Sequence, residues 1–160
     1  MPSTNSQLTN PDPFIVNKQQ CEAIICSFLQ GQGFDLKVID SRNDADLQAA
    51  KAGHKLLIET RGNQAMAHDA NTVFDSTQIS IHLAEQIQLM MKLYEHIDDR
   101  TVLAIANPDT PRIRQQVERL NKALSDLKIV RFWVQKDKMT VTAEYPESLA
   151  ERMQQLGFPL

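Results

Sequence analysis

Two acidic residues, Asp46 and Glu59, occupy positions from which their side chains can meet across a β-hairpin. The sequence predicts short strands on either side of a turn at Ala52 and Gly53. With those two residues as the loop, Asp46 lies directly opposite Glu59, where Cβ atoms are roughly 4.5–5.5 Å apart. Like charges at that spacing repel each other, and paired oxygen ligands suit a hard cation such as Mg²⁺ or Mn²⁺. The hairpin therefore predicts a cation between the two carboxylates.

Arg61 joins these acids because residues two apart on a strand share a face. Glu59 and Arg61 point to one face, whereas Ile58 and Thr60 point to the other. One interpretation is catalytic: the carboxylates hold a divalent metal whose bound water attacks a phosphodiester, and the guanidinium stabilises developing charge. The other is structural: Asp46 and Arg61 are charges at strand ends that pair with Glu59. The residues alone leave both interpretations open.

The spacing of apolar residues places this hairpin within a larger sheet. Apolar runs and alternation predict strands, and apolar residues at helical spacing predict helices. The expected strands cover residues 34–40, 46–50, 55–60, 101–106, 129–134 and 139–142, and the expected helices cover 18–30 and 78–95 and begin again near 111 and 146. A three-strand meander followed by a helical crossover predicts an α/β fold, with a mixed central sheet flanked by helices.

Composition limits the classes of function. The chain has 160 residues, 42% hydrophobic and 23% charged, which is typical of one globular domain. Its net charge of −3 disfavours tight, nonspecific coating of DNA. No apolar run reaches the ~18 residues of a membrane span.

The ends and the cysteines add further expectations. The polar, proline-containing residues 1–13 predict a disordered N-terminal arm ahead of a single domain over 14–160. Cys21 and Cys26 predict buried thiols in a reducing cytoplasm. No organic cofactor is expected, because the glycines of Gly31-Gln32-Gly33 precede a strand and do not open a helix.

In their order along the chain, several of these residues resemble the PD-(D/E)xK, or restriction-endonuclease-like, nuclease superfamily. The superfamily pattern is a helix bearing Glu, a strand with Asp, a strand with Glu-x-Lys and a helix often led by Gln. Here the matching residues are Glu22, Asp46, the run Glu59-Thr60-Arg61-Gly62, and Gln78, and the resemblance covers about residues 18–134.

The resemblance implies a restriction-endonuclease-like fold and a role for each matched residue. Asp46 and Glu59 would be ligands of Mg²⁺ or Mn²⁺, with the Thr60 carbonyl as a third oxygen. Glu22 would lie near them from the first helix, and Gln78 would orient substrate or water.

Arg61 departs from the pattern, because it stands where the superfamily has lysine. That lysine positions or activates the attacking water, whereas arginine stays protonated and cannot act as a general base. In one outcome the protein is an active enzyme, in which either Arg61 acts electrostatically or a lysine from elsewhere takes the role, with Lys37 and Lys55 nearest by strand position. In the other outcome, cleavage has been lost. The first outcome predicts a metal-dependent nuclease that hydrolyses DNA. The second predicts an inactive module that binds nucleic acid or a protein partner. Both outcomes are compatible with a homodimer.

Two further features each have two explanations. Arg112 and Arg114 lie in the first turn of a predicted helix, where the helix dipole disfavours cations. They indicate an anionic partner or an ion pair with Asp109. Trp133 lies in a predicted strand, where it can stack on a nucleic-acid base or pack in the core.

Overall fold

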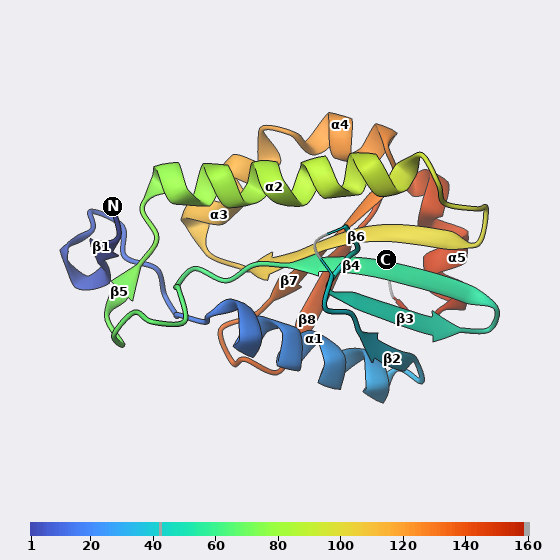
Figure 1. The fold of residues 1–160 in the computed structure, drawn as a ribbon, viewed down its shortest axis with the longest axis horizontal. Coiled ribbons are helices and arrows are strands. Elements are labelled where there is room, and N and C mark those ends of the chain that lie inside the picture. Colours follow the sequence, from blue (N-terminus) through green and yellow to red (C-terminus); the bar gives the residue numbers. More distant parts are fainter. Residues whose placement is uncertain (42, 159–160) are drawn as a thin grey trace.

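The computed structural model describes residues 1–41 and 43–158 and shows a central sheet with helices on both faces (Figure 1). Within these residues the sheet has six strands, in the spatial order β2 (Asp35–Val38), β3 (Leu47–Lys51), β4 (His54–Thr60), β6 (Thr101–Pro108), β7 (Ile129–Val134) and β8 (Val141–Glu144). Neighbouring strands are antiparallel except for the β4–β6 and β6–β7 pairs, which are parallel. The predicted mixed α/β sheet is confirmed.

The helices divide between the two faces of the sheet (Figure 1). The helix α1 (Lys18–Gly31) covers the lower face in that view, and α2 (Ser76–Tyr94), α3 (Pro111–Glu118) and α4 (Asn121–Asp126) cover the upper face. A 3-10 turn, η2 (Glu147–Leu149), leads into α5 (Ala150–Gln155), whose Met153 joins the core on the α1 side. The one helix expected from residue 111 is two helices, because the chain leaves helical geometry at Leu120 (φ −112°, ψ 11°).

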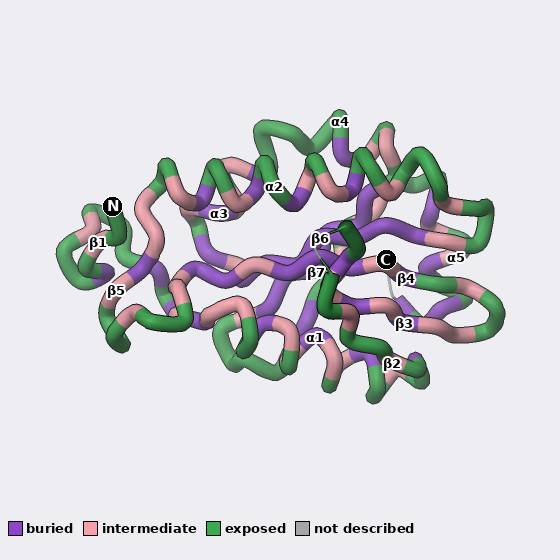
Figure 2. The backbone as a smooth tube through the Cα atoms, viewed as in Figure 1, coloured by how far each residue is buried: buried purple, intermediate pink, exposed green. Residues whose placement is uncertain are grey.

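Two apolar layers form where these helices meet the sheet, and the central strands are buried along most of their length (Figure 2). In β4, Leu56 and Ile58 face the α1 layer with Ile25, whereas Leu57 packs against the α2 layer with Leu83. A strand covered on both faces needs apolar residues at consecutive positions, which explains the continuous Leu-Leu-Ile run.

The β3–β4 hairpin has the register that the sequence predicts. Ala52 and Gly53 form the two-residue loop with positive φ angles of 52° and 79°, as a type I′ turn requires. Lys51 pairs with His54 and Leu47 pairs with Ile58 across the ladder. One step further, Asp46 lies beside Glu59 and Thr60: its N–H donates to Glu59 Oε1, and its Oδ2 accepts from the Thr60 N–H.

Residues 1–13, predicted to be a disordered arm, make strand and side-chain contacts with the rest of the domain in the structure. The strand β1 (Ser3–Thr4) pairs with β5 (Thr72–Val73), and the 3-10 turn η1 (Asn5–Gln7) follows it. Asn5 and Asp12 are buried and hydrogen-bonded to each other through side chain and backbone. A polar composition predicts disorder only when the polar groups lack partners, and here distant residues supply those partners.

The cysteines are unpaired, with Cys21 buried and Cys26 half-buried on α1. Among the described residues, no helix combines the length and the apolar character that crossing a membrane requires.

Candidate functional site

The candidate site is built around the carboxylate of Asp46, at the entry to β3. Its Oδ2 accepts hydrogen bonds from the Thr60 backbone N–H (2.9 Å) and from the Thr60 hydroxyl (3.0 Å). The Asp46 backbone N–H donates to Glu59 Oε1 at 3.0 Å. Hydrogen bonds thus run in both directions across the strand pair, from the Asp46 N–H to Glu59 and from Thr60 to the Asp46 carboxylate.

Glu59 is buried and paired with Arg61, which directly follows the end of β4. Arg61 Nη1 donates to Glu59 Oε2 at 2.6 Å and to the Thr60 carbonyl at 2.8 Å. The structural interpretation of the strand-end charges predicted an ion pair between Arg61 and Glu59, and this ion pair is present. One lone pair of the Thr60 carbonyl, expected as a metal ligand, is taken by this guanidinium.

Glu22 approaches the same strand from α1, on the opposite face from Glu59. Its Oε1 lies 3.5 Å from the hydroxyl of Thr60, which also reaches Asp46 Oδ2. Thr60 points toward α1 because Thr60 and Glu59 alternate along β4. The three acids Glu22, Asp46 and Glu59, called the carboxylate cluster below, thus gather around the end of β4, with Asp46 between the other two.

Lys18 is the lysine that reaches this cluster, and sequence reasoning missed it. Its Nζ lies 3.1 Å from Asp46 Oδ1 and 3.9 Å from Glu59 Oε2. Lys18 precedes Glu22 by one helical turn, which places both on one face of α1 and was the available signal. The lysines named instead lie elsewhere: Lys37 is exposed on the edge strand β2, and Lys55 is at the opposite end of β4 from Glu59.

A close contact between two chain segments delivers Lys18 to the cluster. The chain enters α1 beside the segment that leaves β4, with Asn17 and Gln64 forming a parallel bridge (Figure 1). Asn17 caps α1 in a capping box with Gln20, which determines where the helix starts. Lys18 is the first residue of the helix and therefore stands next to the end of β4.

Negative charge exceeds positive charge in the cluster, where three carboxylates meet one ammonium and one guanidinium. Burial raises the pKa of Glu22 above its ordinary value, and the nearby charge of Asp46 raises it further. Burial also raises the pKa of Glu59, with a contribution from Asp46, although the hydrogen bond from Arg61 opposes the rise. Both rises come first from burial, so these two acids hold a proton more tightly than they would in water.

The donor atoms of the cluster fit a divalent cation in kind and in charge, since Mg²⁺ and Mn²⁺ prefer carboxylate oxygens. The present arrangement is not a ready metal centre: within residues 1–41 and 43–158, no three His, Cys, Asp or Glu side chains form a group that could hold a metal ion. The space between Asp46 and Glu59 holds the Lys18 ammonium instead.

Gln78, expected to orient substrate or water, has a structural role in this arrangement. It forms the capping box of α2 with Asp75, in which each side chain accepts the other residue's backbone N–H. The glutamine that touches the site is Gln86, which is buried and donates to the Glu59 carbonyl at 3.1 Å and the Ala106 carbonyl at 3.3 Å. A polar residue within the buried stripe of α2 was the signal that could have identified it.

The other candidate residues have structural partners. Arg114 pairs with Asp109 and with Glu144, and its guanidinium lies 4.1 Å from the ring centroid of the buried Trp133. Arg112 pairs with Asp12 and not with Asp109. Core packing and ion pairing therefore account for these residues.

Replacing Glu22 with glutamine is expected to stabilise the protein at neutral pH. Because the pKa of Glu22 is raised above 4.5, the folded state holds this proton more tightly than the unfolded chain. Stability is therefore lost as pH rises from that ordinary value through the raised pKa. The carboxylate is half-buried and partly screened by solvent, so Glu22→Gln should raise the Tm at pH 7 by only about 2 °C.

Melting curves of Glu22→Gln and wild type should converge below about pH 4, where the wild-type carboxyl is protonated in both states. Glu95→Gln, a change at an exposed position that ends α2, is the matched control. A Glu22→Gln protein that melts below wild type at pH 7 would show that the Glu22 charge is fully compensated.

Comparison with known proteins supports the fold assignment. No protein-family model and no curated protein matches this sequence. Among solved structures, an XisH family protein from Nostoc punctiforme PCC 73102 superposes with a TM-score of 0.51 over 80% of this chain and 99% of that chain. The chain has a restriction-endonuclease-like fold. Sequence identity is 10%, so the likeness concerns the fold alone.

Proposed function

We propose that this protein is a metal-dependent nuclease of the PD-(D/E)xK type that hydrolyses DNA phosphodiester bonds. The observation that carries the proposal is the convergence of Glu22, Asp46 and Glu59 at the end of β4, with more negative charge than the local cations compensate. The restriction-endonuclease-like fold supports it, because the three acids come from the helix and the hairpin strands of the superfamily pattern.

Each residue of the cluster has a role in this proposal. Asp46 and Glu59 would hold Mg²⁺ or Mn²⁺, and Glu22 adds negative charge from the α1 side. The ion would polarise the phosphodiester and lower the pKa of a bound water. Arg61 stays charged, so it neutralises phosphate and does not accept a proton. Gln86 holds the Glu59 and Ala106 carbonyls and thereby positions the end of β4.

The ion pairs within the cluster favour a second candidate function. Lys18 and Arg61 pair with the carboxylates that a metal would need. A protein in which these pairs are permanent would be an inactive restriction-endonuclease-like module that binds nucleic acid or a protein partner. Such a module binds no divalent ion at this site and cuts no DNA.

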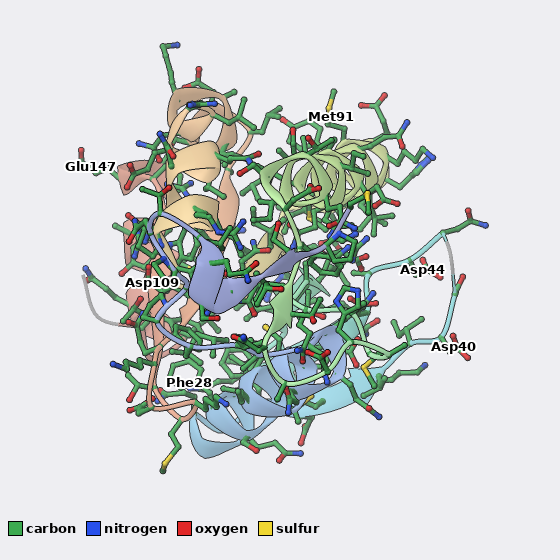
Figure 3. All side chains as sticks on the ribbon, turned by 90° about the vertical axis from the view of Figure 1, so that its left-hand side faces the viewer. Phe28, Asp40, Asp44, Met91, Asp109 and Glu147 are labelled. Carbon is green, nitrogen blue, oxygen red and sulfur yellow. The ribbon has the colours of Figure 1, made fainter. Side chains whose placement is uncertain are left out.

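A cleavage assay separates the two functions. The protein is incubated with single-stranded and double-stranded DNA in Mg²⁺, in Mn²⁺ or in excess chelator. Cleavage is expected with a metal and should fall to the chelator level in Asp46→Ala and in Glu59→Ala. Asp40→Ala is the matched control, since Asp40 is exposed on the loop between β2 and β3 (Figure 3). Undiminished cleavage by both site variants would exclude this site, and no cleavage under any condition would favour the binding module.

A further inference from the structure

Lys18 lies where a cation would bridge the two hairpin acids. Asp46 Oδ2 is engaged by Thr60, so Oδ1 is the oxygen of this carboxylate that faces the ammonium. Glu59 Oε1 is likewise engaged by the Asp46 N–H, and its Oε2 faces both Arg61 and Lys18. The Lys18 ammonium thus faces the free Oδ1 of Asp46 and shares Oε2 of Glu59 with Arg61.

We infer that Lys18 is an internal counter-ion of the carboxylate cluster, and that a divalent cation binds there only as the Lys18 ammonium leaves. This inference rests on the proposed function, because it concerns the same metal site. It makes metal binding an exchange of one cation for another.

The two cations of the site differ in how firmly they are held. The Arg61 side chain is 17% exposed, and its Nη1 is bound both to Glu59 and to a backbone carbonyl. The Lys18 side chain is 40% exposed and projects from the first residue of α1, where the helix dipole disfavours a positive charge. Lys18 can therefore leave without a change in the backbone, whereas Arg61 remains.

Charge favours the exchange. When the three carboxylates are ionised, they and the Arg61 guanidinium together carry two negative charges in excess. The Lys18 ammonium cancels one of these charges, whereas a divalent cation cancels both. The exchange thus neutralises the second negative charge, which Lys18 leaves uncancelled in this partly buried site.

The test is calorimetric titration of the metal-free protein with MnCl₂ alone, without DNA, so the readout does not depend on activity. Lys18→Met keeps much of the apolar stem and removes the competing charge. It should bind Mn²⁺ about tenfold more tightly than wild type, a typical coupling between two ligands of one site. Lys37→Met, a change at an exposed position on β2, is the matched control and should bind like wild type.

A second measurement keeps the wild-type chain. In a lysine-selective NMR titration, the side-chain signal of Lys18 should shift with the same Mg²⁺ concentration dependence as binding, while that of Lys37 stays in place. Metal binding by wild type with equal or weaker binding by Lys18→Met would overturn the inference and leave the proposed function standing. Absence of binding by both proteins would overturn the proposed function and the inference with it.

Discussion

Replacing Gly62 with alanine is expected to destabilise the fold by about 3 kcal/mol, because a Cβ at this position would collide with backbone. That Cβ would lie 2.3 Å from the Val16 carbonyl oxygen and 2.5 Å from the Asn17 carbonyl carbon. Backbone atoms cannot turn aside as a side chain can. The segment that enters α1 would therefore move away from the end of β4 and take Lys18 and Glu22 with it.

Gly31→Ala provides the matched control, since a Cβ there meets nothing within 4 Å and Gly31 is the last residue of α1. It should melt at or slightly above the wild-type temperature. Denaturant unfolding gives the free-energy change, and titration with Mn²⁺ gives the effect on the site. A Gly62→Ala protein as stable as Gly31→Ala would refute the close approach of the two segments.

Replacing Arg112 with alanine is expected to lower the free energy of unfolding by about 3–5 kcal/mol, because it leaves the buried carboxylate of Asp12 without its cation. Arg112 Nε and Nη2 each donate to Asp12 at 2.8 Å, and the Asp12 side chain is 0% exposed. Asn63 Nδ2 also donates to this carboxylate, at 3.0 Å, and Asn63 Oδ1 accepts the N–H of Val16. Loss of the ion pair should therefore also disturb the chain where it enters α1, at the Val16 N–H that Asn63 holds.

The Tm of Arg112→Ala should fall by on the order of 10 °C. Arg119→Ala, a change at the exposed end of the same helix, should stay within about 0.5 kcal/mol of wild type. Adding Asp12→Asn to Arg112→Ala should recover part of the loss, since the uncompensated charge is then absent. If Arg112→Ala alone costs less than about 1 kcal/mol, the ion pair is not the anchor of the N-terminal segment.

The fold and the grouping of Glu22, Asp46 and Glu59 could be predicted from the resemblance to a nuclease superfamily, because the motifs that carry it are local. A two-residue turn at Ala52 and Gly53 sets the pairing of every residue in the hairpin, so the opposition of Asp46 and Glu59 follows from a short stretch of chain. The placement of Glu22 on the sheet-facing side of α1 follows from helical spacing in the same way.

Contacts that depend on distant partners lay beyond the reach of the local motifs. Gln78 matches the motif by position, but the capping box of α2 uses it, whereas Gln86 reaches the site from two turns further along. Lys18 lies 28 positions before Asp46 in the chain, and strand position alone pointed to other lysines. Residues 1–13 look disordered by composition, yet Arg112, one hundred residues from Asp12, holds them in place.

The sequence by itself determined the mixed sheet, the hairpin register and the acids at the end of the strand, because turns and apolar periodicity act between near neighbours. Only the tertiary structure decided which cations meet those acids and which segment anchors the entry to α1. Those choices depend on burial and on charges brought together by packing, and the spacing of residues along the chain does not contain them.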